Sequence, residues 1–221
     1  IAMNSLYAIP GYYLIEECSA TSAGNLEWFI QNCLENERIP QGKGLYQHID
    51  HMAASVPAEK SDVYFLPFLY GTNAHPLGKG AFIGLTTYHR KAHMARAVYE
   101  GVAYSHKTHI DRLLSVRTPP KAIRMAGGVV NSPFWVQMFA DVLGFPIETV
   151  RVKELGALGC AMAAAVAAGV YRNYPDAAKA MVHIHTTVRP REEMTRIYRE
   201  KYEKYRAVRT TLDTVWERFT I

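Results

Sequence analysis

The sequence lacks the features of a membrane protein or of a disulfide-stabilised secreted protein. No apolar run approaches the roughly 18 to 20 residues that a membrane-spanning helix needs, and no signal-peptide pattern opens the chain. Only three cysteines occur, Cys18, Cys33 and Cys160, and their odd number and spacing suit neither a disulfide framework nor a metal or redox motif. We therefore expect buried free thiols in a cytoplasmic protein with no membrane partner.

The sequence also lacks a basic block of the kind that binds nucleic acid, although its net charge is +5. Much of the positive charge lies in residues 189–218, where it is interleaved with glutamates as on a solvated helix face. Several histidine pairs have spacings that fit one helical face, but no third ligand accompanies any pair. We expect neither a nucleic-acid partner nor a metal site in this chain.

Length and composition predict one large folded domain. The chain has 221 residues, of which 49% are hydrophobic and 20% charged, as in ordinary globular proteins. It shows no internal repeat or low-complexity segment. Because the first residue is Ile1 and not methionine, we expect a piece of something longer, although processing or tag removal would look the same.

Helical and strand-like patterns alternate along the chain. Apolar spacing predicts helices at residues 23–34, 45–55, 93–114, 133–143, 155–168 and 190–219. Short apolar or alternating runs predict strands at residues 12–15, 64–69, 122–126 and 147–152. Residues 71–80 are rich in glycine and predict a loop. This alternation predicts an α/β domain with a largely parallel sheet.

The helix predicted at residues 155–168 has an unusual composition, LGALGCAMAAAVAA. A helix that is apolar on all sides is usually buried. Small residues such as Gly156 and Gly159 allow a neighbouring backbone to approach closely. We therefore expect this helix to be buried against the sheet or another helix.

Residues 121–144 carry the clearest ligand-binding pattern. A short apolar strand ends at Gly127 and Gly128, whose backbone freedom permits a sharp turn and the close approach of a ligand. Ser132 followed by Pro133 then marks the start of a helix. A strand, a glycine turn and a helix N-terminus can together bind phosphate or ribose. The same pattern also occurs in αβ turns that bind nothing.

Two further segments take the chain beyond a generic α/β protein. Gly80 to Glu100, GAFIGLTTYHRKAHMARAVYE, resembles the C-terminal signature of the FGGY carbohydrate kinase family. The matching positions are Gly80, Phe82, Gly84, Leu85, His93, Met94, Ala97, Val98, Tyr99 and Glu100. The glycine pair with SPFWVQMFADVLG resembles the adenosine-binding turn and helix of that family, and ELGALGCA from Glu154 resembles its small-residue helix. The opening GYYLIEECSATSAGNLEWF is similar to pentulose kinases such as the L-xylulose kinases.

The resemblance implies a ribonuclease-H-like, actin-like ATPase lobe, with a mixed sheet flanked by helices and a long C-terminal helix. In this family two such lobes bind sugar and ATP in the cleft between them. Residues 1–221 resemble the C-terminal nucleotide-binding lobe, so the N-terminal lobe is absent from this chain.

The implied activity is transfer of the γ-phosphate of ATP, with Mg²⁺, to a hydroxyl of a ketopentose such as xylulose. The partner is then a sugar or related polyol, and a homodimer is allowed for. The alternatives are an actin-like ATPase and a nucleotide-binding module without sugar kinase activity.

Carried over residue by residue, the resemblance implies a nucleotide site at Ala23, Glu27, Gly127, Gly128, Asn131 and Ser132. Ala23 would line the phosphate and ribose side through its backbone, and Glu27 would lie on the adenosine side. The glycine pair would let the nucleotide lie against the main chain, with Asn131 or Ser132 reaching the adenine. Related kinases often carry glycine where Ala23 stands and asparagine where Ser132 stands.

No catalytic residue is assigned in this chain. In the family that the sequence resembles, the catalytic aspartate and the first phosphate loop precede the C-terminal lobe. Asp62, Asp111 and Asp141 do not match the motif around that aspartate. We therefore expect the isolated chain to be inactive as a sugar kinase.

Overall fold

The computed structural model describes residues 3–20, 22–152 and 154–219 of the chain. The elements in chain order are β1 (Met3–Leu6), β2 (Tyr13–Glu16), α1 (Gly24–Cys33), α2 (Leu45–Ala54), η1 (Ala58–Lys60), β3 (Tyr64–Leu66), β4 (Ala81–Ile83), α3 (Lys91–Leu114), β5 (Ile123–Arg124), η2 (Gly128–Asn131), α4 (Pro133–Leu143), β6 (Ile147–Val150), α5 (Leu155–Ala167), α6 (Tyr174–Met181), β7 (Ile184–Val188), α7 (Glu192–Asp213) and η3 (Trp216–Phe219), where η marks a short 3-10 helix. None of the helices in the described ranges combines the length and the hydrophobicity that a membrane span requires.

Every predicted helix and strand is present, with ends shifted by a few residues. Among the described elements, the strands β1, β4 and β7, the helix α6 and the 3-10 helices η1 and η2 were not predicted. The strands among them are short, and β1 and β7 mix apolar with polar residues without regular alternation, as in IHTTV. Such segments are placed by pairing with a neighbouring strand and not by a pattern of their own.

The described strands form three small sheets. The central one has the order β5-β6-β7, with β5 parallel and β7 antiparallel to β6. The other two are the antiparallel pairs β1-β2 and β3-β4. The prediction of a largely parallel sheet is therefore wrong, and the mixed sheet is confirmed. The reason is the excursion through α5 and α6, which returns the chain to the end of β6 where it left, so that β7 runs antiparallel.

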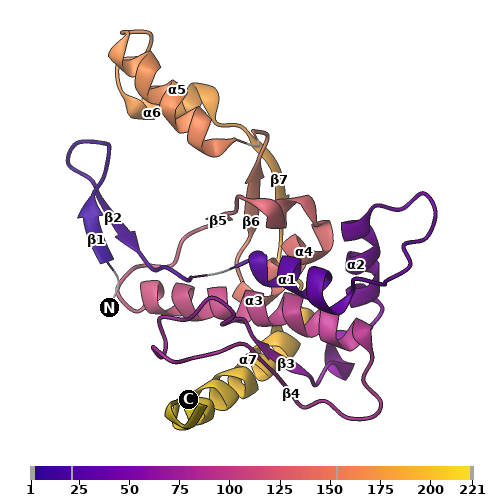
Figure 1. The fold of residues 1–221 in the computed structure, drawn as a ribbon. Coiled ribbons are helices and arrows are strands. Elements are labelled where there is room, and N and C mark those ends of the chain that lie inside the picture. The colour runs from indigo at the N-terminus through magenta and orange to yellow at the C-terminus, as the bar shows by residue number, and fades with distance from the viewer. Residues whose placement is uncertain (1–2, 21, 153, 220–221) are drawn as a thin grey trace.

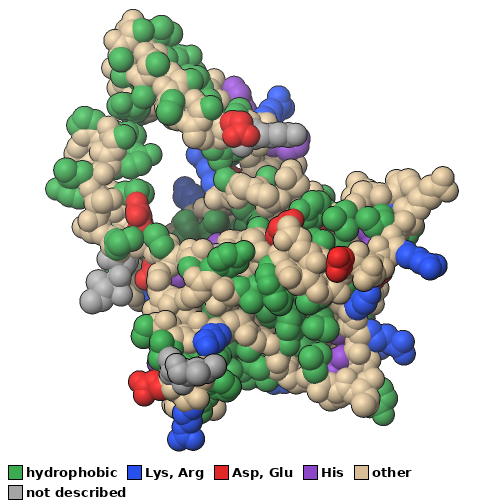
Figure 2. All heavy atoms as spheres, in the orientation of Figure 1, with side chains coloured by type: hydrophobic (Ala, Val, Ile, Leu, Met, Phe, Trp, Pro, Cys, Tyr) green, Lys and Arg blue, Asp and Glu red, His purple; other side chains and the backbone are tan. Residues whose placement is uncertain are grey.

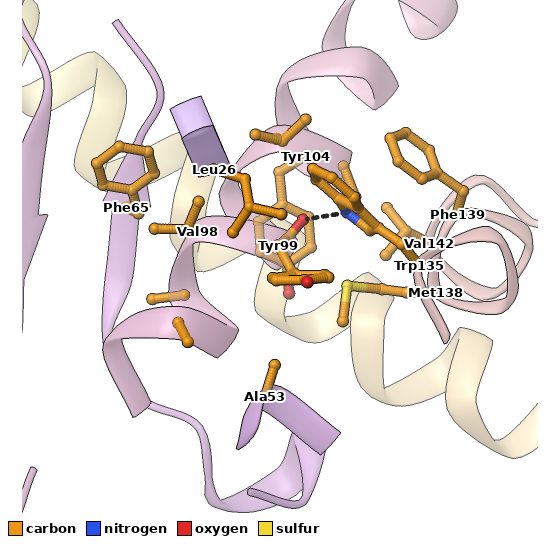
Figure 3. Close-up of a cluster of buried hydrophobic side chains, with 14 of the residues drawn as sticks. Leu26, Ala53, Phe65, Val98, Tyr99, Tyr104, Trp135, Met138, Phe139 and Val142 are labelled. Atoms are coloured by element: carbon orange, nitrogen blue, oxygen red, sulfur yellow. Dashed lines mark hydrogen bonds between the residues drawn. The ribbon is translucent and has the colours of Figure 1, made fainter. Parts of the chain in front are cut away.

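Helix α3 lies at the centre of the body and is buried along residues 95–105 (Figures 1 and 3). One side packs against β3, where a Cβ atom on Gly101 would lie 2.2 Å from the carbonyl oxygen of Phe65. The other side packs against α4, where the rings of Tyr99 and Trp135 lie 4.5 Å apart between centroids. The indole Nε1 of Trp135 also donates a hydrogen bond of 3.1 Å to the carbonyl oxygen of Tyr99. Thus α3 joins β3 to α4.

The C-terminal helix α7 is docked on the body, as its apolar stripe predicted. Tyr198, Tyr202 and Tyr205 are buried and surround Tyr104 of α3. Lys201, also buried, places its Nζ 2.6 Å from the carboxylate of Glu100. The helix is therefore held by both apolar and ionic contacts.

The α5 helix contradicts its predicted burial. It packs against α6, and the two project as a helical hairpin from the rest of the chain (Figure 1). No residue of α5 is buried, and Cβ atoms added at Gly156 or Gly159 would meet no atom within 4 Å. The small residues allow close packing, but within the described residues nothing except α6 lies against them.

Exposed apolar side chains also cover the β1-β2 hairpin, where Leu6 is 82% and Tyr13 66% exposed. Figure 2 shows apolar side chains over both projecting hairpins. The expectation of buried thiols fails for the same reason, because Cys160 lies on α5 and is exposed. Cys18, just after β2, is exposed as well, and Cys33 is half-buried.

Candidate functional site

A cavity of about 390 Å³ lies between the start of α1, helix α2, the middle of α3 and the start of α4. Five of the six residues predicted for the nucleotide site line it: Ala23, Glu27, Gly128, Asn131 and Ser132. They come from two segments about a hundred residues apart in the sequence. The remaining lining residues are Gly24, Leu26, Tyr46, Asp50, Tyr99 and Trp135.

The sixth predicted residue, Gly127, lines a neighbouring hollow of about 380 Å³. Gly128 and Asn131 line this hollow as well as the first cavity, so the glycine turn forms the boundary between the two. Glu154, at the start of α5, lines the second hollow from the other side. The predicted site residues thus lie together, around two adjoining spaces.

The two glycines of the turn have different backbone geometry. Gly127 has φ of +85° and ψ of −168°, a region that is essentially restricted to glycine. Gly128 does not have a positive φ. Cβ atoms added at either position would meet nothing within 4 Å. The turn is therefore open toward the two hollows, and a ligand can approach its main chain.

Ser132 begins α4 in the way that the sequence predicted. Its hydroxyl oxygen accepts a hydrogen bond of 3.1 Å from the backbone N–H of Trp135, and Pro133 follows at the first helical position. Gly144 ends the helix with φ of +73°. The hydroxyl of Ser132 is therefore already used in this capping hydrogen bond. The positive end of the α4 dipole lies at the cavity wall.

Two carboxylates line the cavity, and each accepts a hydrogen bond from a tyrosine. Glu27 Oε2 accepts from the hydroxyl of Tyr46 at 2.5 Å, and Asp50 Oδ1 accepts from the hydroxyl of Tyr99 at 2.6 Å. The bond to Glu27 and partial burial raise the pKa of Tyr46. Burial, with the bond to Asp50, raises the pKa of Tyr99. Both tyrosines therefore remain neutral hydrogen-bond donors at neutral pH.

The lining of this cavity is rich in acceptors and contains no Lys, Arg or His among the described residues. Carboxylate oxygens suit ligand hydroxyls and amino groups, and they repel phosphate. Trp135, Tyr99 and Leu26 supply apolar and aromatic surface beside them. The cavity therefore fits the nucleoside part of a nucleotide better than its phosphates.

Tyr46, Asp50 and Tyr99 were not predicted as site residues. Tyr46 and Asp50 are four residues apart on α2 and so share one helix face, but nothing in that spacing points to a ligand. Tyr99 belongs to the segment 80–100 that carries the family resemblance. Its place in that pattern predicts no contact with a ligand.

The three aspartates considered for a catalytic role line neither space. Asp62 Oδ1 lies 2.7 Å from Nε2 of His89, and Asp111 Oδ1 lies 3.0 Å from Nζ of Lys107. Asp141 is fully buried and binds the side chain and the backbone N–H of Arg191. Nor do the described ranges hold a cluster of three His, Cys, Asp or Glu side chains suited to a metal ion.

The segment 80–100 is buried over residues 95–100 and exposed over residues 84–88. Gly84 has φ of +92°, and a Cβ atom there would lie 2.8 Å from the carbonyl oxygen of Asp62. Glu100 is buried between Arg96, at 2.7 Å, and Lys201. Within this segment, Tyr99 alone lines the cavity.

Comparison with known proteins gives a family match over most of the chain. Residues 3–168 match the C-terminal domain of the FGGY family of carbohydrate kinases. The L-xylulose/3-keto-L-gulonate kinase of Escherichia coli (strain K12) is 38% identical over 199 residues, which cover 90% of this chain and 38% of that protein. A probable L-xylulose kinase of Pasteurella multocida is 36% identical over 210 residues, covering 93% of this chain and 40% of that protein. The chain thus spans about two fifths of the length of these relatives.

Solved structures share the fold. A ligand-bound xylulose kinase from Lactobacillus acidophilus matches with a TM-score of 0.88 at 24% identity, over 99% of this chain and 44% of that one. A xylulose kinase from Rhodospirillum rubrum matches with a TM-score of 0.85 at 25% identity, over 98% and 43%. These matches confirm the predicted fold class, an α/β, actin-like lobe with a mixed sheet and a long C-terminal helix.

Proposed function

Because the chain belongs to the FGGY family of carbohydrate kinases, we propose that it is the C-terminal nucleotide-binding lobe of a two-lobe sugar kinase. The proposed reaction transfers the γ-phosphate of ATP to a hydroxyl of a ketopentose such as xylulose. One structural observation carries the proposal. Two segments that resemble the nucleotide site of this family, residues 23–27 and 128–132, converge on one cavity.

In this proposal the cavity holds the adenosine part of ATP. Glu27 and Asp50 offer acceptors to ribose hydroxyls or to the adenine amino group, and Trp135 offers aromatic surface. Gly127 and Gly128 leave the main chain open, so that the nucleotide can lie against it. Ala23, Asn131 and Ser132 complete the walls through their backbone and short side chains.

The Mg²⁺ site and the catalytic base are assigned to the portion of the parent protein outside this chain. Phosphoryl transfer needs Mg²⁺ to neutralise charge on the phosphates and a carboxylate to accept the proton of the sugar hydroxyl. Glu27 and Asp50 are already bound to tyrosines, and the cavity suits the nucleoside, so we place neither function on them. This assignment agrees with the span of the chain, 38% and 40% of two curated relatives.

The experiment measures two properties of the full-length protein. Calorimetry with ADP tests nucleotide binding, and an ADP-release assay tests phosphorylation of L-xylulose, D-xylulose and glycerol. We expect ADP binding and a sugar-dependent rate that is highest with a xylulose. ADP binding with ATP hydrolysis that no sugar stimulates would support the alternative of an actin-like ATPase.

Gly128→Val tests the placement of the nucleotide within that protein. A branched side chain would project into the space that the nucleotide is proposed to fill, so ADP affinity should fall about tenfold or more. The matched control is Gly159→Val, at a glycine of α5 that lines neither hollow, has no positive φ and also has no atom within 4 Å of its Cβ position. Unchanged ADP affinity in a folded Gly128→Val protein would show that the glycine turn does not contact the nucleotide.

A further inference from the structure

We propose that Ser22 and Glu17 are positioning residues for the nucleotide site, because α3 binds both and so fixes the cavity wall at the start of α1. The inference rests on the proposed function and deepens it. Neither side chain lines the cavity. Both act through Ala23 and Gly24, which line the cavity.

The segment between β2 and α1 needs such an anchor. Its described residues, 17–20 and 22–23, form neither helix nor strand, so no backbone ladder determines where the segment runs. The first turn of α1 also has no side-chain cap, since Ala23 occupies the N-cap position. The position of the wall therefore depends on the packing of the buried face of α1 against α3 and on contacts that side chains of the preceding segment make with other elements.

Glu17 provides the first contact. Its side chain is only 5% exposed, and Oε2 lies 2.8 Å from Nδ1 of His109 and 3.4 Å from Nη1 of Arg112. Burial acts to raise the pKa of the Glu17 carboxyl, but these two neighbours outweigh it and lower the pKa. The carboxylate is therefore ionised at neutral pH and bound to two side chains of α3.

Ser22 provides the second contact, next to the wall itself. Its hydroxyl oxygen lies 2.7 Å from Nε2 of His106, a largely buried imidazole whose edge meets the ring of Phe139. The carbonyl oxygen of Ser22 accepts a 3.0 Å hydrogen bond from the side-chain amide of Asn25, which is fully buried. Ser22 is thus held through both its side chain and its backbone.

The geometry makes α3 a common support for two walls of the cavity. His106, His109 and Arg112 recur at every third position and hold the β2-α1 segment. About two helical turns before His106, Tyr99 lines the cavity and its carbonyl oxygen accepts a hydrogen bond from Trp135 of α4. Loss of the Ser22 contact should therefore displace the α1 wall while the α4 wall stays in place.

The test is Ser22→Ala in the full-length protein, with ADP affinity from calorimetry and KM values for ATP and xylulose. Removing one partly buried hydrogen bond should weaken ADP binding and raise the KM for ATP by about threefold to tenfold. The KM for xylulose should change less than twofold, because the sugar is assigned to another part of the protein. Ser22→Thr keeps the hydroxyl and should restore ADP affinity to within twofold of the wild type.

Two controls separate positioning from general stability. Ser55→Ala removes an exposed hydroxyl that bonds only to the backbone of its own helix, and it should leave both KM values unchanged. His106→Leu should weaken ADP binding about as much as Ser22→Ala. The double variant should bind ADP no more weakly than the single variant with the lower affinity, because both substitutions break the same hydrogen bond.

Some outcomes would overturn the inference alone. These are normal ADP binding by a folded Ser22→Ala protein, equal losses in Ser22→Ala and Ser22→Thr, or additive losses in the double variant. Failure of the wild-type protein to bind ADP would overturn the proposed function, and this inference with it.

Discussion

The ammonium group of Lys201 on α7 lies 2.6 Å from the carboxylate of Glu100 on α3, and both side chains are more than nine-tenths buried. The guanidinium of Arg96 binds the other oxygen of the same carboxylate at 2.7 Å. Arg96 further donates to Tyr198 of α7 and to the carbonyl oxygen of Val56. One buried acid thus balances two buried bases and joins the C-terminal helix to the core.

Glu100→Gln should therefore destabilise the chain strongly. The amide keeps the shape of the side chain but leaves two buried cations without a counter-charge, which costs about 3 to 5 kcal/mol in comparable cases. Urea unfolding followed by circular dichroism measures the loss in the 221-residue chain. Glu203→Gln is the matched control, because Glu203 pairs with Arg206 on the surface of α7, and it should cost less than about 1 kcal/mol. Equal effects at the two positions would contradict the role given to Glu100.

Gly127→Ala should cost about 1 to 3 kcal/mol of unfolding free energy, since an L-residue is strained at the positive φ of this position. Gly128→Ala is the control within the same turn. Its backbone lacks the positive φ and its Cβ would meet nothing within 4 Å, so the change should be within about 0.5 kcal/mol. Thermal or urea unfolding of both variants decides. The prediction fails if Gly127→Ala is as stable as Gly128→Ala.

Stability should fall as the pH drops below neutral, in part because of His106. Burial, with a smaller effect of His109, lowers the pKa of His106 from 6.5 to about 4. The unfolded chain therefore takes up this proton at a higher pH than the folded chain does. The contribution of His106 is complete above pH 6.5 and is lost as the pH falls toward 4. It amounts to about 2 kcal/mol between pH 7.5 and pH 5.

The check is urea unfolding of the wild type and His106→Gln at those two pH values. The variant has no imidazole at this position, so its stability should depend less steeply on pH. Carboxylates whose pKa the fold lowers, including Glu17, Glu37 and Asp62, add a loss at more acidic pH in both proteins. Parallel pH curves for the two proteins would refute the assignment.

Gly159→Leu should leave the stability of the 221-residue chain unchanged or raise it by up to about 1 kcal/mol. The glycine lies in α5, where an added Cβ meets no atom within 4 Å and where leucine is the better helix former. Gly101→Ala is the contrast, because its Cβ would collide with the backbone of Phe65, and it should destabilise strongly. A melting temperature lowered by several degrees in Gly159→Leu would indicate that α5 is packed more tightly than the structure shows.

The sequence allowed the local backbone features around Gly127 and Ser132 to be predicted better than the packing. Gly127, Ser132 and Pro133 act through local backbone chemistry, so their turn, cap and helix start could be predicted without knowledge of the fold. That Ala23 and Glu27 lie opposite them followed only from the family resemblance. Tyr46 and Asp50 escaped prediction because they reach the cavity through the docking of α2 on α3, which no local pattern specifies.

Burial was the property that sequence reasoning misjudged. The composition of α5 predicted a buried helix because its side chains are small and apolar. That prediction is wrong, because burial also requires a neighbouring surface. Among the described residues that neighbour is α6 alone, so Gly156 and Cys160 lie exposed. The antiparallel placement of β7 was likewise unpredictable, because it depends on where the α5-α6 excursion returns.

Gly84 and Glu100 hold strands and helices in place, while the nucleotide is proposed to bind at Gly127, Gly128 and the residues around them. A related protein with a changed turn would therefore lose ATP binding and still keep the segment 80–100, because folding requires that segment. A genome survey that recognises kinases by that segment would count such inactive proteins as enzymes. A survey that scores the turn at Gly127 and Gly128 separately from the segment 80–100 would distinguish proteins that keep the nucleotide site from proteins that have lost it.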